Sequence, residues 1–561
     1  KNKIIPKIQK IAYEKNLEVL DLFSMFIDRE DLFLDKVHPS SLGGTLISKR
    51  LYELVKLETD KRSPIFERIK EQKVMSSFYG YACADFAYKN RNCKVVSPKK
   101  VADGQPWVWR ARFWGHEPQT DIALLERGFH IVYIDVAELY GNEESVKLWN
   151  QFYDYMQNVG MAKKVVLGFS GGLDTTYCVK YLTEEKGYEV HSILVNTGGF
   201  DEIELARIEA HAKKLGVKSH TTIEATTDYY NRIIRYLIYG NVLKNNTYPL
   251  SVSAERLSQA LHIAEHAKQL GAEAVAHGST GAGNDQVRFD MIFQILIPGI
   301  EIITPIRDLQ LSREQEIEYL KSKGVVMNFE KAVYSINKGL WGTSVGGKET
   351  LHSNGMLPEE AWPTPLTKEG HEEVVLHFKQ GELLGVNGKE FKHPVEAIQA
   401  LQQIAGGFAI GRDIHVGDTI IGIKGRVGFE AAAPLIILKA HHALEKHVLS
   451  KWQLQWKDQL AQFYGNWLHE GQILDPVMRD IEAYLTNSQQ QVTGKVFVQL
   501  LPYRFQVTGI ESPFDLMNSK FGKYGEMNTG FTGQDVRGFT RIFGNQVGIY
   551  HRVQQTGHEK D

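Results

Sequence analysis

A glycine-rich turn, SGGLDT at residues 170–175, follows an apolar strand and opens an amphipathic helix. Glycines at such a turn permit positive φ and let backbone N–H groups approach an anion closely. The helix directs its unpaired N–H groups and the positive end of its dipole at the same place, which favours phosphate. The turn lacks the lysine of a Walker loop, so no ammonium is placed on a γ-phosphate. The pattern predicts a phosphate site; the plainer alternative is a strand-to-helix turn without a ligand.

A second glycine-rich turn, HGSTGAGNDQVRF at residues 277–289, follows the apolar run 273–276. It supplies a hydroxyl, an amide, a carboxylate and a guanidinium, from Thr280, Asn284, Asp285 and Arg288. Arg288 suits a carboxylate and Asp285 an ammonium, so the set predicts a site for a zwitterionic amino acid. Each residue alone is ordinary in a surface loop, but two such turns after neighbouring strands indicate a common site.

The first turn is similar to the pyrophosphate loop of enzymes that cleave ATP to AMP and pyrophosphate. From about residue 163 to the C-terminus, the chain resembles the argininosuccinate synthase family. The motifs that carry the resemblance, in family order, are SGGLDT, NTGG (196–199), TYPLSVSAER (247–256), HGSTGAGNDQVRF and YSINKGLWG (334–342). The resemblance implies a carbon–nitrogen ligase of arginine biosynthesis. It would condense citrulline with aspartate through a citrullyl-adenylate, with ATP and Mg²⁺.

The resemblance also implies the site residues. Those expected to hold ATP and its pyrophosphate are Gly168, Ser170, Gly171, Gly172, Asp174, Thr175, Thr176, Val195 and Gly278. Those expected to contact citrulline are Tyr248, Ser253, Asn284, Arg288, Ser335 and Ser344, and those expected to contact aspartate are Thr280, Asn284 and Asp285. The expected catalytic residues are Asp174, Asp285 and Arg288, and no residue is assigned to a metal, since Mg²⁺ would bridge phosphate oxygens. An alternative for Ser253 is that it only caps its helix.

The chain departs from the family's pattern at a few positions. Ala282 stands where a lysine is common, which removes a cation near the phosphates. Gly417 and Phe429 stand where many members have a glutamate and a tyrosine that touch citrulline. Either other side chains compensate, with His415, Asp418 and Glu430 as the candidates, or the substrate is a citrulline derivative without a free amine.

The first 160 residues resemble pieces of other proteins. Residues 1–60, with Asp35 and His38 in the sequence DKVHP, are similar to the C-terminal block of SGNH-type esterases. The nucleophilic serine of that family would lie upstream, so an exposed loop pair is the better interpretation of these two residues. The chain begins at Lys1 and not at Met, which leaves room for an upstream segment.

Residues 62–162 resemble the first half of an α/β-hydrolase, with WGHEP at 114–118 in the place of an oxyanion loop. The string GFSGG at 168–172 fits a G-x-S-x-G nucleophile elbow, so a serine hydrolase using Ser170 is the main rival function. Another pyrophosphate-loop ATPase, such as a tRNA-modifying enzyme, is a second rival. A non-catalytic binding protein is a third. The hydrolase-like part and the synthase-like part meet near residues 162–168. The sequence fits both a natural fusion at this place and an artefact of assembly.

Composition limits the remaining possibilities. The 561 residues are 43% hydrophobic and 24% charged, which indicates an ordinary soluble chain of several domains. A net charge of −2 predicts no general affinity for nucleic acid or anionic membranes. The three cysteines are too few and too scattered for a disulfide framework or a zinc site. Without a spanning apolar run or a signal peptide, a cytoplasmic location is expected.

The pattern of elements predicts the fold class. Apolar β-branched strands at 163–169, 189–196, 217–224, 272–278 and 301–307 alternate with helices, which is typical of a doubly wound parallel α/β sheet. We therefore expect a pyrophosphate-loop domain at 163–331 and an α+β synthetase domain at 332–561. The family resemblance implies that the helix around Val536, Phe539 and Ile542 belongs to a C-terminal arm that clasps neighbouring subunits in a homotetramer. The alternative is that this helix docks on its own chain.

Overall fold

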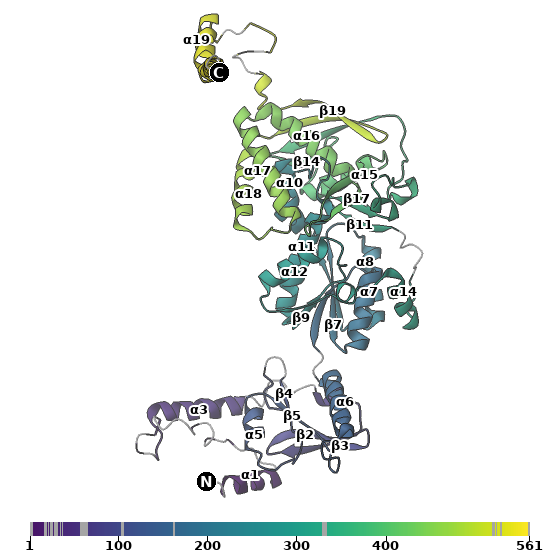
Figure 1. Cartoon of the computed structure of the whole chain (residues 1–561), viewed down its shortest axis with the longest axis vertical. Helices are drawn as coiled ribbons and strands as arrows, with labels where there is room; N and C mark the ends of the chain where they lie inside the picture. The colour runs from purple at the N-terminus through teal and green to yellow at the C-terminus, as the bar shows by residue number, and fades with distance from the viewer. Residues whose placement is uncertain are drawn as a thin grey trace. The chain divides into compact units, whose positions relative to one another are not determined.

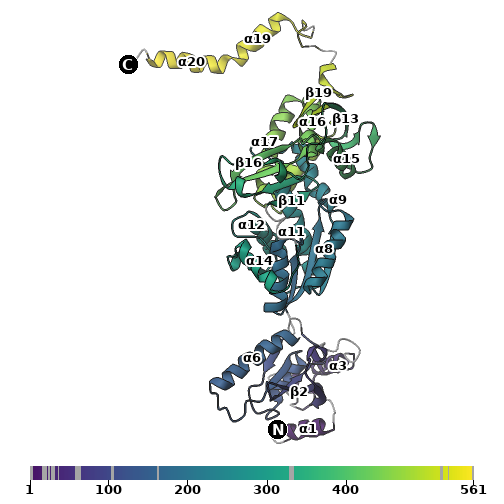
Figure 2. The same ribbon diagram turned by 90° about the vertical axis from the view of Figure 1, so that its right-hand side faces the viewer.

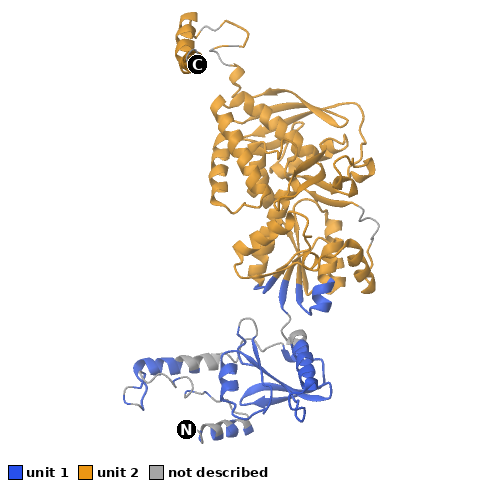
Figure 3. Cartoon of the chain, in the orientation of Figure 1, with its two compact units in different colours: residues 1–165, 180–190, 271–274 blue, residues 166–179, 191–270, 275–561 orange. Residues whose placement is uncertain are grey.

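The structure, a computed structural model, describes residues 4–15, 20, 22, 26, 32–33, 35, 37–56, 65–102, 106–160, 163–327, 334–518, 522, 524–527 and 530–558. This part of the chain divides into two compact units, residues 1–165, 180–190 and 271–274 in one and 166–179, 191–270 and 275–561 in the other (Figure 3). Most of residues 17–26, in the segment that resembles an esterase, lie outside the described residues. None of the described helices combines the length and the apolar character needed to cross a membrane.

The N-terminal region contains a five-stranded sheet in the order β1-β2-β3-β5-β4. Its elements are α1 (Ile5–Glu14), α3 (Ser41–Lys56), α4 (Ile65–Arg68), β1 (Lys73–Phe78), β2 (Tyr81–Tyr88), β3 (Arg91–Val96), β4 (Trp107–Trp109), α5 (Gln119–Glu126), β5 (His130–Ile134) and α6 (Glu143–Gly160). Neighbouring strands pair antiparallel except β4 and β5, which are parallel. The kinship of this region with esterases and hydrolases stays a prediction.

A second five-stranded sheet follows, in the order β10-β9-β6-β7-β8. Its strands are β6 (Lys164–Gly168), β7 (Glu189–Asn196), β8 (Ser219–Glu224), β9 (Ala274–Ala276) and β10 (Glu301–Ile303). Their apolar runs are buried in β6, β7 and β9, and β7 pairs with β8 in parallel. All five predicted strands are present and the α/β fold class is confirmed, although the last strand ends at Ile303 and not at residue 307, because α13 (Pro305–Asp308) follows it.

Helices cover both faces of this sheet. They include α7 (Leu173–Lys180), which continues as the π-helix η3 (Tyr181–Glu185), α8 (Glu202–Leu215), α9 (Thr226–Tyr229), η4 (Tyr230–Ile234), α10 (Arg235–Gly240), α11 (Ser251–Leu270), α12 (Asp285–Leu296), α13 (Pro305–Asp308) and α14 (Arg313–Ser322). Helix α8 lies on one side of the sheet and α12 on the other (Figures 1 and 2). Capping boxes are present at Asp201 and Ser312, and Gly271 adopts φ 62° after α11. These caps fix where the helices begin and end.

The C-terminal half mixes two antiparallel sheets with long helices, as expected for an α+β domain. One sheet has the order β11-β12-β17-β16 and the other β15-β14-β13-β18-β19. The strands are β11 (Ser335–Gly339), β12 (Gly342–Gly346), β13 (Glu372–Lys379), β14 (Glu382–Val386), β15 (Lys389–Glu390), β16 (Arg412–Asp418), β17 (Lys424–Glu430), β18 (Gly494–Leu501) and β19 (Arg504–Glu511). The helices are α15 (Pro394–Gly406), α16 (Ala432–Val448), α17 (Lys451–His469), α18 (Pro476–Ser488), α19 (Gly533–Phe543) and α20 (Asn545–His558), with short 3-10 turns η6 (Lys348–Leu351), η7 (Glu359–Ala361) and η8 (Leu516–Asn518).

Candidate active site

The two glycine turns share one cavity of about 830 Å³ at the ends of β6, β7 and β9. The predicted residues in its lining are Gly168, Ser170, Gly172, Asp174, Thr175, Val195, Gly278, Thr280, Asp285 and Ser335. The predicted residues outside its lining are Gly171, Thr176, Tyr248, Ser253, Asn284, Arg288 and Ser344. Residues far apart in the sequence thus converge where ligands of α/β sheets bind.

The first turn has the geometry of an anion site. Gly171 has φ 76°, and a Cβ there would lie 3.2 Å from Ile208 Cγ1, so both conformation and space favour glycine. The backbone N–H of Gly172 donates to Ser170 Oγ at 3.4 Å, and Ser170 Oγ lies 3.3 Å from Thr175 Oγ1. The hydroxyl groups and N–H groups of the turn therefore gather at the N-terminus of α7, which attracts negative charge.

Thr176 is oriented differently from its neighbours in this turn. Its side chain is fully buried, and its Oγ1 lies 3.1 Å from His211 Nε2. The hydroxyl therefore faces the body of the domain in this structure, and its contact with pyrophosphate stays a prediction.

The contacts of Ser170 bear on the rival hydrolase interpretation. Within the described part of the chain, the hydrogen-bond partners of Ser170 Oγ are Thr175 and Gly172, neither of which is a base. A nucleophilic serine requires an imidazole within hydrogen-bond reach. These contacts favour a phosphate ligand over a hydrolase nucleophile.

The Asp35–His38 pair occurs as an exposed loop contact. His38 Nδ1 lies 2.6 Å from Asp35 Oδ2, and their side chains are 80% and 56% exposed. This agrees with the preferred interpretation of the two residues as a surface pair.

The second turn packs directly on the first. A Cβ at Gly278 would lie 3.2 Å from Asp174 Cβ and 3.3 Å from Thr175 Cγ2, tighter than most real contacts. A side chain at residue 278 would therefore push the turn after β9 away from the start of α7. The glycine is needed for close approach, because it lets two loops share one ligand-sized space.

The guanidinium groups of two arginines donate hydrogen bonds to the carboxylate of Asp285 at the start of α12. Arg256 Nε donates to Asp285 Oδ2 at 3.0 Å, and Arg288 Nη1 donates to Asp285 Oδ1 at 3.1 Å. Burial alone would raise the pKa of Asp285, but the two guanidinium groups outweigh it and hold the pKa below its ordinary value. Arg256 lines the cavity and was missed by sequence reasoning, although it ends the TYPLSVSAER motif.

Arg288 itself is buried in contacts with the protein. Its Nη2 donates to Ser253 Oγ at 2.9 Å and to the carbonyl of His469 at 2.8 Å, and the residue is 2% exposed. Since its guanidinium lies outside the cavity lining, a direct bond to a substrate carboxylate would require one of these bonds to be exchanged.

The alternative in which Ser253 only caps its helix is wrong. Helix α11 begins at Ser251, so Ser253 lies inside the first turn and not before it. The hydroxyl of Tyr248 accepts a hydrogen bond from the Val252 N–H at 2.9 Å, which satisfies a donor at the helix start. A tyrosine from the preceding loop takes the capping role, so the Ser253 hydroxyl is left to bind Arg288 and His469.

The remaining predicted citrulline residues form a buried cluster beside the cavity. The rings of Tyr248 and His415 stack with centroids 5.0 Å apart, and Phe429 lies 5.3 Å from Tyr248. Asn337 Nδ2 donates to Ser344 Oγ at 3.3 Å, and Asn337 itself lines the cavity. Ser344 is thus one hydrogen bond away from the cavity wall.

Asn284 likewise bonds to the protein. Its Oδ1 accepts from the Ile420 N–H at 2.8 Å, which ties the second glycine turn to the β16–β17 loop. Its amide Nδ2 is the part left for a substrate.

The space of the missing family glutamate is filled by an imidazole. A Cβ at Gly417 would lie 2.6 Å from His415 Nε2, so no side chain fits there without moving the ring. Burial, with Lys244 nearby, lowers the pKa of His415 below its ordinary value and keeps it neutral. His415 is therefore the candidate to replace the carboxylate.

Glu430 and Asp418, the other two side chains that could compensate for the absent glutamate, interact with other residues. Glu430 accepts a hydrogen bond from Thr364 Oγ1 at 2.6 Å and is buried. Asp418 pairs with Lys424 at 2.5 Å, and its side chain is 68% exposed. Neither carboxylate is placed to substitute for the family's glutamate.

A second acid faces Asp174 in the cavity and was not predicted. Glu316, on α14, lines the same cavity and is 2% exposed. Burial and the adjacent Asp174 carboxyl raise the pKa of Glu316 to about 8, and burial also raises the pKa of Asp174. The sequence held a signal for it, because Glu316 shares a helix face with the buried Leu320, an unusual place for an acid.

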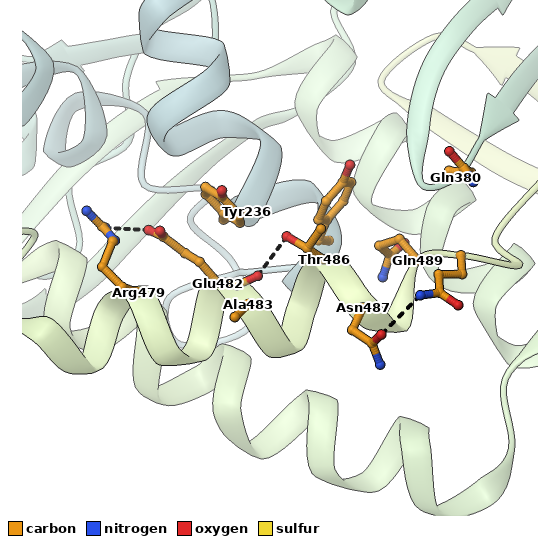
Figure 4. A pocket seen from close by; sticks show the side chains of 10 residues that line it. Tyr236, Gln380, Arg479, Glu482, Ala483, Thr486, Asn487 and Gln489 are labelled. Carbon is orange, nitrogen blue, oxygen red and sulfur yellow. Dashed lines mark hydrogen bonds and ion pairs between the residues drawn. The ribbon is translucent and has the colours of Figure 1, made fainter.

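Another cavity, of about 510 Å³, lies between α10, α18 and the β13–β14 turn (Figure 4). Its polar side chains bond mainly to one another: Arg479 Nη2 to Glu482 at 2.5 Å, and Gln490 Nε2 to Asn487 at 3.1 Å. None of the predicted site residues lines it.

Two models of one protein family match the part of the chain that forms this cavity. The family model "Arginosuccinate synthase N-terminal HUP domain" matches residues 164–326, and the model of that family's C-terminal domain matches residues 334–550. The argininosuccinate synthase of Methanocaldococcus jannaschii is 38% identical over 393 residues, which cover 70% of this chain and 98% of that protein. This chain belongs to the argininosuccinate synthase family. It is accordingly a carbon–nitrogen ligase that uses ATP.

Other members of the family align over a similar share of the chain. The argininosuccinate synthase of Xylella fastidiosa is 35% identical over 407 residues, covering 70% of this chain and 98% of that protein. That of Dictyoglomus thermophilum is 35% identical over 398 residues, covering 69% and 97%. The match to the N-terminal family model includes both glycine turns, which supports the interpretation of the cavity as a nucleotide site.

Proposed function

We propose that this chain condenses citrulline with aspartate, using ATP and releasing AMP and pyrophosphate. The observation that carries the proposal is the single cavity in which the SGGLDT turn, the Gly278 turn and Asp285 meet. A nucleotide and an amino acid bound there would bring their reacting groups together, and positioning is most of what such a reaction needs.

The ureido oxygen of citrulline is a poor leaving group, so it must first be activated. It attacks the α-phosphorus of ATP, the bond to pyrophosphate breaks, and a citrullyl-adenylate forms. The aspartate amine then attacks the activated carbon, and the amine loses a proton. AMP leaves and carries the former ureido oxygen of citrulline. The Ser170 and Thr175 hydroxyls and the N–H groups around Gly172 would stabilise the departing pyrophosphate, while Val195 and Gly278 flank the adenosine.

Asp285 would hold the aspartate ammonium, with Thr280 and Asn284 beside it. Its own ion pairs with Arg256 and Arg288 keep it ionised, and hence able to accept hydrogen bonds from the amine. The proposed citrulline contacts are Tyr248, Ser253, Asn284, Arg288, Ser335 and Ser344. Of these, Ser335 lines the cavity.

We also propose a homotetramer and retain a cytoplasmic location as a prediction. Helix α19 supports the assembly, because its apolar residues Val536, Phe539 and Ile542 are 42%, 61% and 79% exposed. An apolar stripe of this kind is typical of an interaction surface. The exposure disfavours the alternative in which this helix docks on its own chain.

Pyrophosphate release that requires citrulline and aspartate together tests the proposed function. Asp174→Ala should abolish adenylylation, whereas Asp285→Ala should spare it and block condensation. Positional isotope exchange in ATP with citrulline alone separates the two half-reactions. Equal loss of exchange in both variants would contradict the assignment.

A further inference from the structure

Glu255, near the start of α11, places a carboxyl group in the wall of the cavity. The residue is 3% exposed, and its Oε1 accepts hydrogen bonds from Thr197 Oγ1 at 2.7 Å and from Gln259 Nε2 at 3.2 Å. A Cβ at Gly339 would lie 3.2 Å from Glu255 Cδ, so the glycine at the end of β11 leaves the space that the carboxyl group occupies. Contacts from the loop after β7, from α11 and from β11 therefore hold this group in one position.

The other oxygen of the same carboxyl group makes no hydrogen bond within the described part of the chain. Oε2 lies 4.0 Å from Arg256 Nη1, which is beyond hydrogen-bonding distance. The same guanidinium donates from its Nε to Asp285 at 3.0 Å, so one arginine side chain contacts Asp285 and lies next to Glu255. An ammonium group held by Asp285, as proposed for aspartate, would therefore lie in the same part of the cavity as Glu255.

The two acids beside this arginine differ in how readily they take up a proton. Burial raises the pKa of Glu255 above its ordinary value, and the negative charge of Asp285 raises it further. The Arg256 guanidinium and the Thr197 hydroxyl oppose this rise without cancelling it. The phenol of Tyr229 also faces Glu255, but its burial raises its pKa and keeps it neutral. Since the pKa of Asp285 is lowered, Glu255 is suited to accept a proton and Asp285 to hold a cation.

Other groups in the cavity wall that could serve as bases are bound to protein partners. The two ring nitrogens of His277 contact the Asp290 carboxylate and a backbone N–H. Glu204 accepts a backbone hydrogen bond in the capping box of α8. The acids at the starts of α7 and α14 are hydrogen-bonded to each other beside the pyrophosphate turn. The buried acid of α11 is thus left as the proton acceptor for the aspartate site.

We propose that Glu255 accepts the proton that the aspartate ammonium must lose before it attacks the activated citrulline. The inference rests on the proposed function, because that reaction supplies the ammonium. The ammonium gives one proton to Glu255 Oε2, and the freed lone pair of the nitrogen forms the bond to carbon. The carbon–oxygen bond to AMP then breaks, and its electron pair leaves with the phosphate of AMP. A second proton passes from the nitrogen to this phosphate, and Glu255 returns its own proton to water.

The test measures condensation separately from adenylylation in the full chain. The citrullyl-adenylate is first formed from ATP and citrulline, and labelled aspartate is then added in a rapid-quench experiment. Glu255→Gln retains an oxygen for Thr197 but takes up no proton, so condensation should slow by about 100-fold or more, while the KM for aspartate stays near the wild-type value. Positional isotope exchange in ATP with citrulline alone should be unchanged. The matched control is Glu265→Gln on the exposed side of the same helix, which should condense as the wild type does.

Two further measurements distinguish proton transfer from an effect of shape. The wild-type condensation rate should fall as the pH is lowered through the pKa of Glu255, because only the carboxylate accepts a proton, whereas the rate of Glu255→Gln should not follow this titration. Glu255→Asp retains a carboxyl group and should condense faster than Glu255→Gln does. Thermal unfolding checks that each variant folds.

The outcomes separate this role from the proposed function. Wild-type condensation in Glu255→Gln, or equal rates in the Asp and Gln variants, would overturn the role of Glu255 and leave the proposed function intact. Equal loss of adenylylation and condensation in Glu255→Gln would also overturn it, since the first step needs no base at the aspartate amine. A wild-type chain without isotope exchange in the presence of citrulline would refute the proposed function, and the role of Glu255 with it.

Discussion

Protonation of His469 should destabilise the protein in mild acid. His469 ends α17, is 6% exposed, and its Nδ1 lies 3.1 Å from Ser253 Oγ and 3.4 Å from Arg288 Nη2. Burial, with the positive charges of Arg288 and Lys244, lowers the pKa of His469 to about 3 from the model-peptide value of 6.5. The unfolded chain therefore binds this proton first as the pH falls.

The sign and size of the effect follow from that difference. Stability from neutral His469 is fully present above pH 6.5 and is lost as the pH falls from 6.5 toward about 3. At pH 5 the loss is about 1.5 pH units times ~1.4 kcal/mol, or ~2 kcal/mol. His469→Gln keeps a hydrogen-bonding side chain that does not titrate, so it should remove this part of the acid sensitivity.

Urea unfolding at pH 7.5 and pH 5.0, followed by tryptophan fluorescence, measures the effect. The wild type should lose ~2 kcal/mol more than His469→Gln between the two values. His371→Gln is the control, because His371 is exposed. Parallel pH dependence of the wild type and His469→Gln would refute the argument.

Three further outcomes are expected. Gly199→Ala should destabilise the protein by about 1–3 kcal/mol and weaken nucleotide binding, because its Cβ would lie 2.1 Å from the Lys338 carbonyl oxygen on β11. The control Gly346→Ala, whose Cβ would be 3.7 Å from its nearest neighbour, should be mild in thermal unfolding. The full chain should hydrolyse p-nitrophenyl acetate no faster than Ser170→Ala does, and fluorophosphonate labelling of Ser170 would contradict this. The fragment 163–561 should fold and form AMP with both substrates, and a soluble but inactive fragment would count against it.

Much of the nucleotide domain could be predicted because its signals are local. Continuous apolar runs mark the strands, and the caps at Asp201 and Ser312 depend on residues three apart in sequence. The start of α11 was missed because its cap is the hydroxyl of Tyr248, a residue type that capping rules do not include.

The site was predicted less completely, because several of its contacts join residues that are far apart in the sequence. The glycine turns are contiguous motifs, but the contacts of Arg256 with Asp285 and of Glu316 with Asp174 join distant segments. Sequence spacing carries no information on such pairs. The hydrogen bond from Arg288 to the carbonyl group of His469 depends on the end of α17, 181 residues further along the chain, and the contact of Arg288 with citrulline stays a prediction.

The strand order has a consequence for how the chain is made. Strand β9 lies next to β6, although β7, β8 and several helices separate the two strands in sequence. Gly278, which follows β9, packs against Asp174, which follows β6. During synthesis on the ribosome, β6 therefore emerges long before β9, and the edge of β6 that pairs with β9 stays unpaired until then. The nascent chain cannot bind ATP as proposed until β9, α14 and β11 have followed, so the nucleotide can stabilise the domain only late in synthesis.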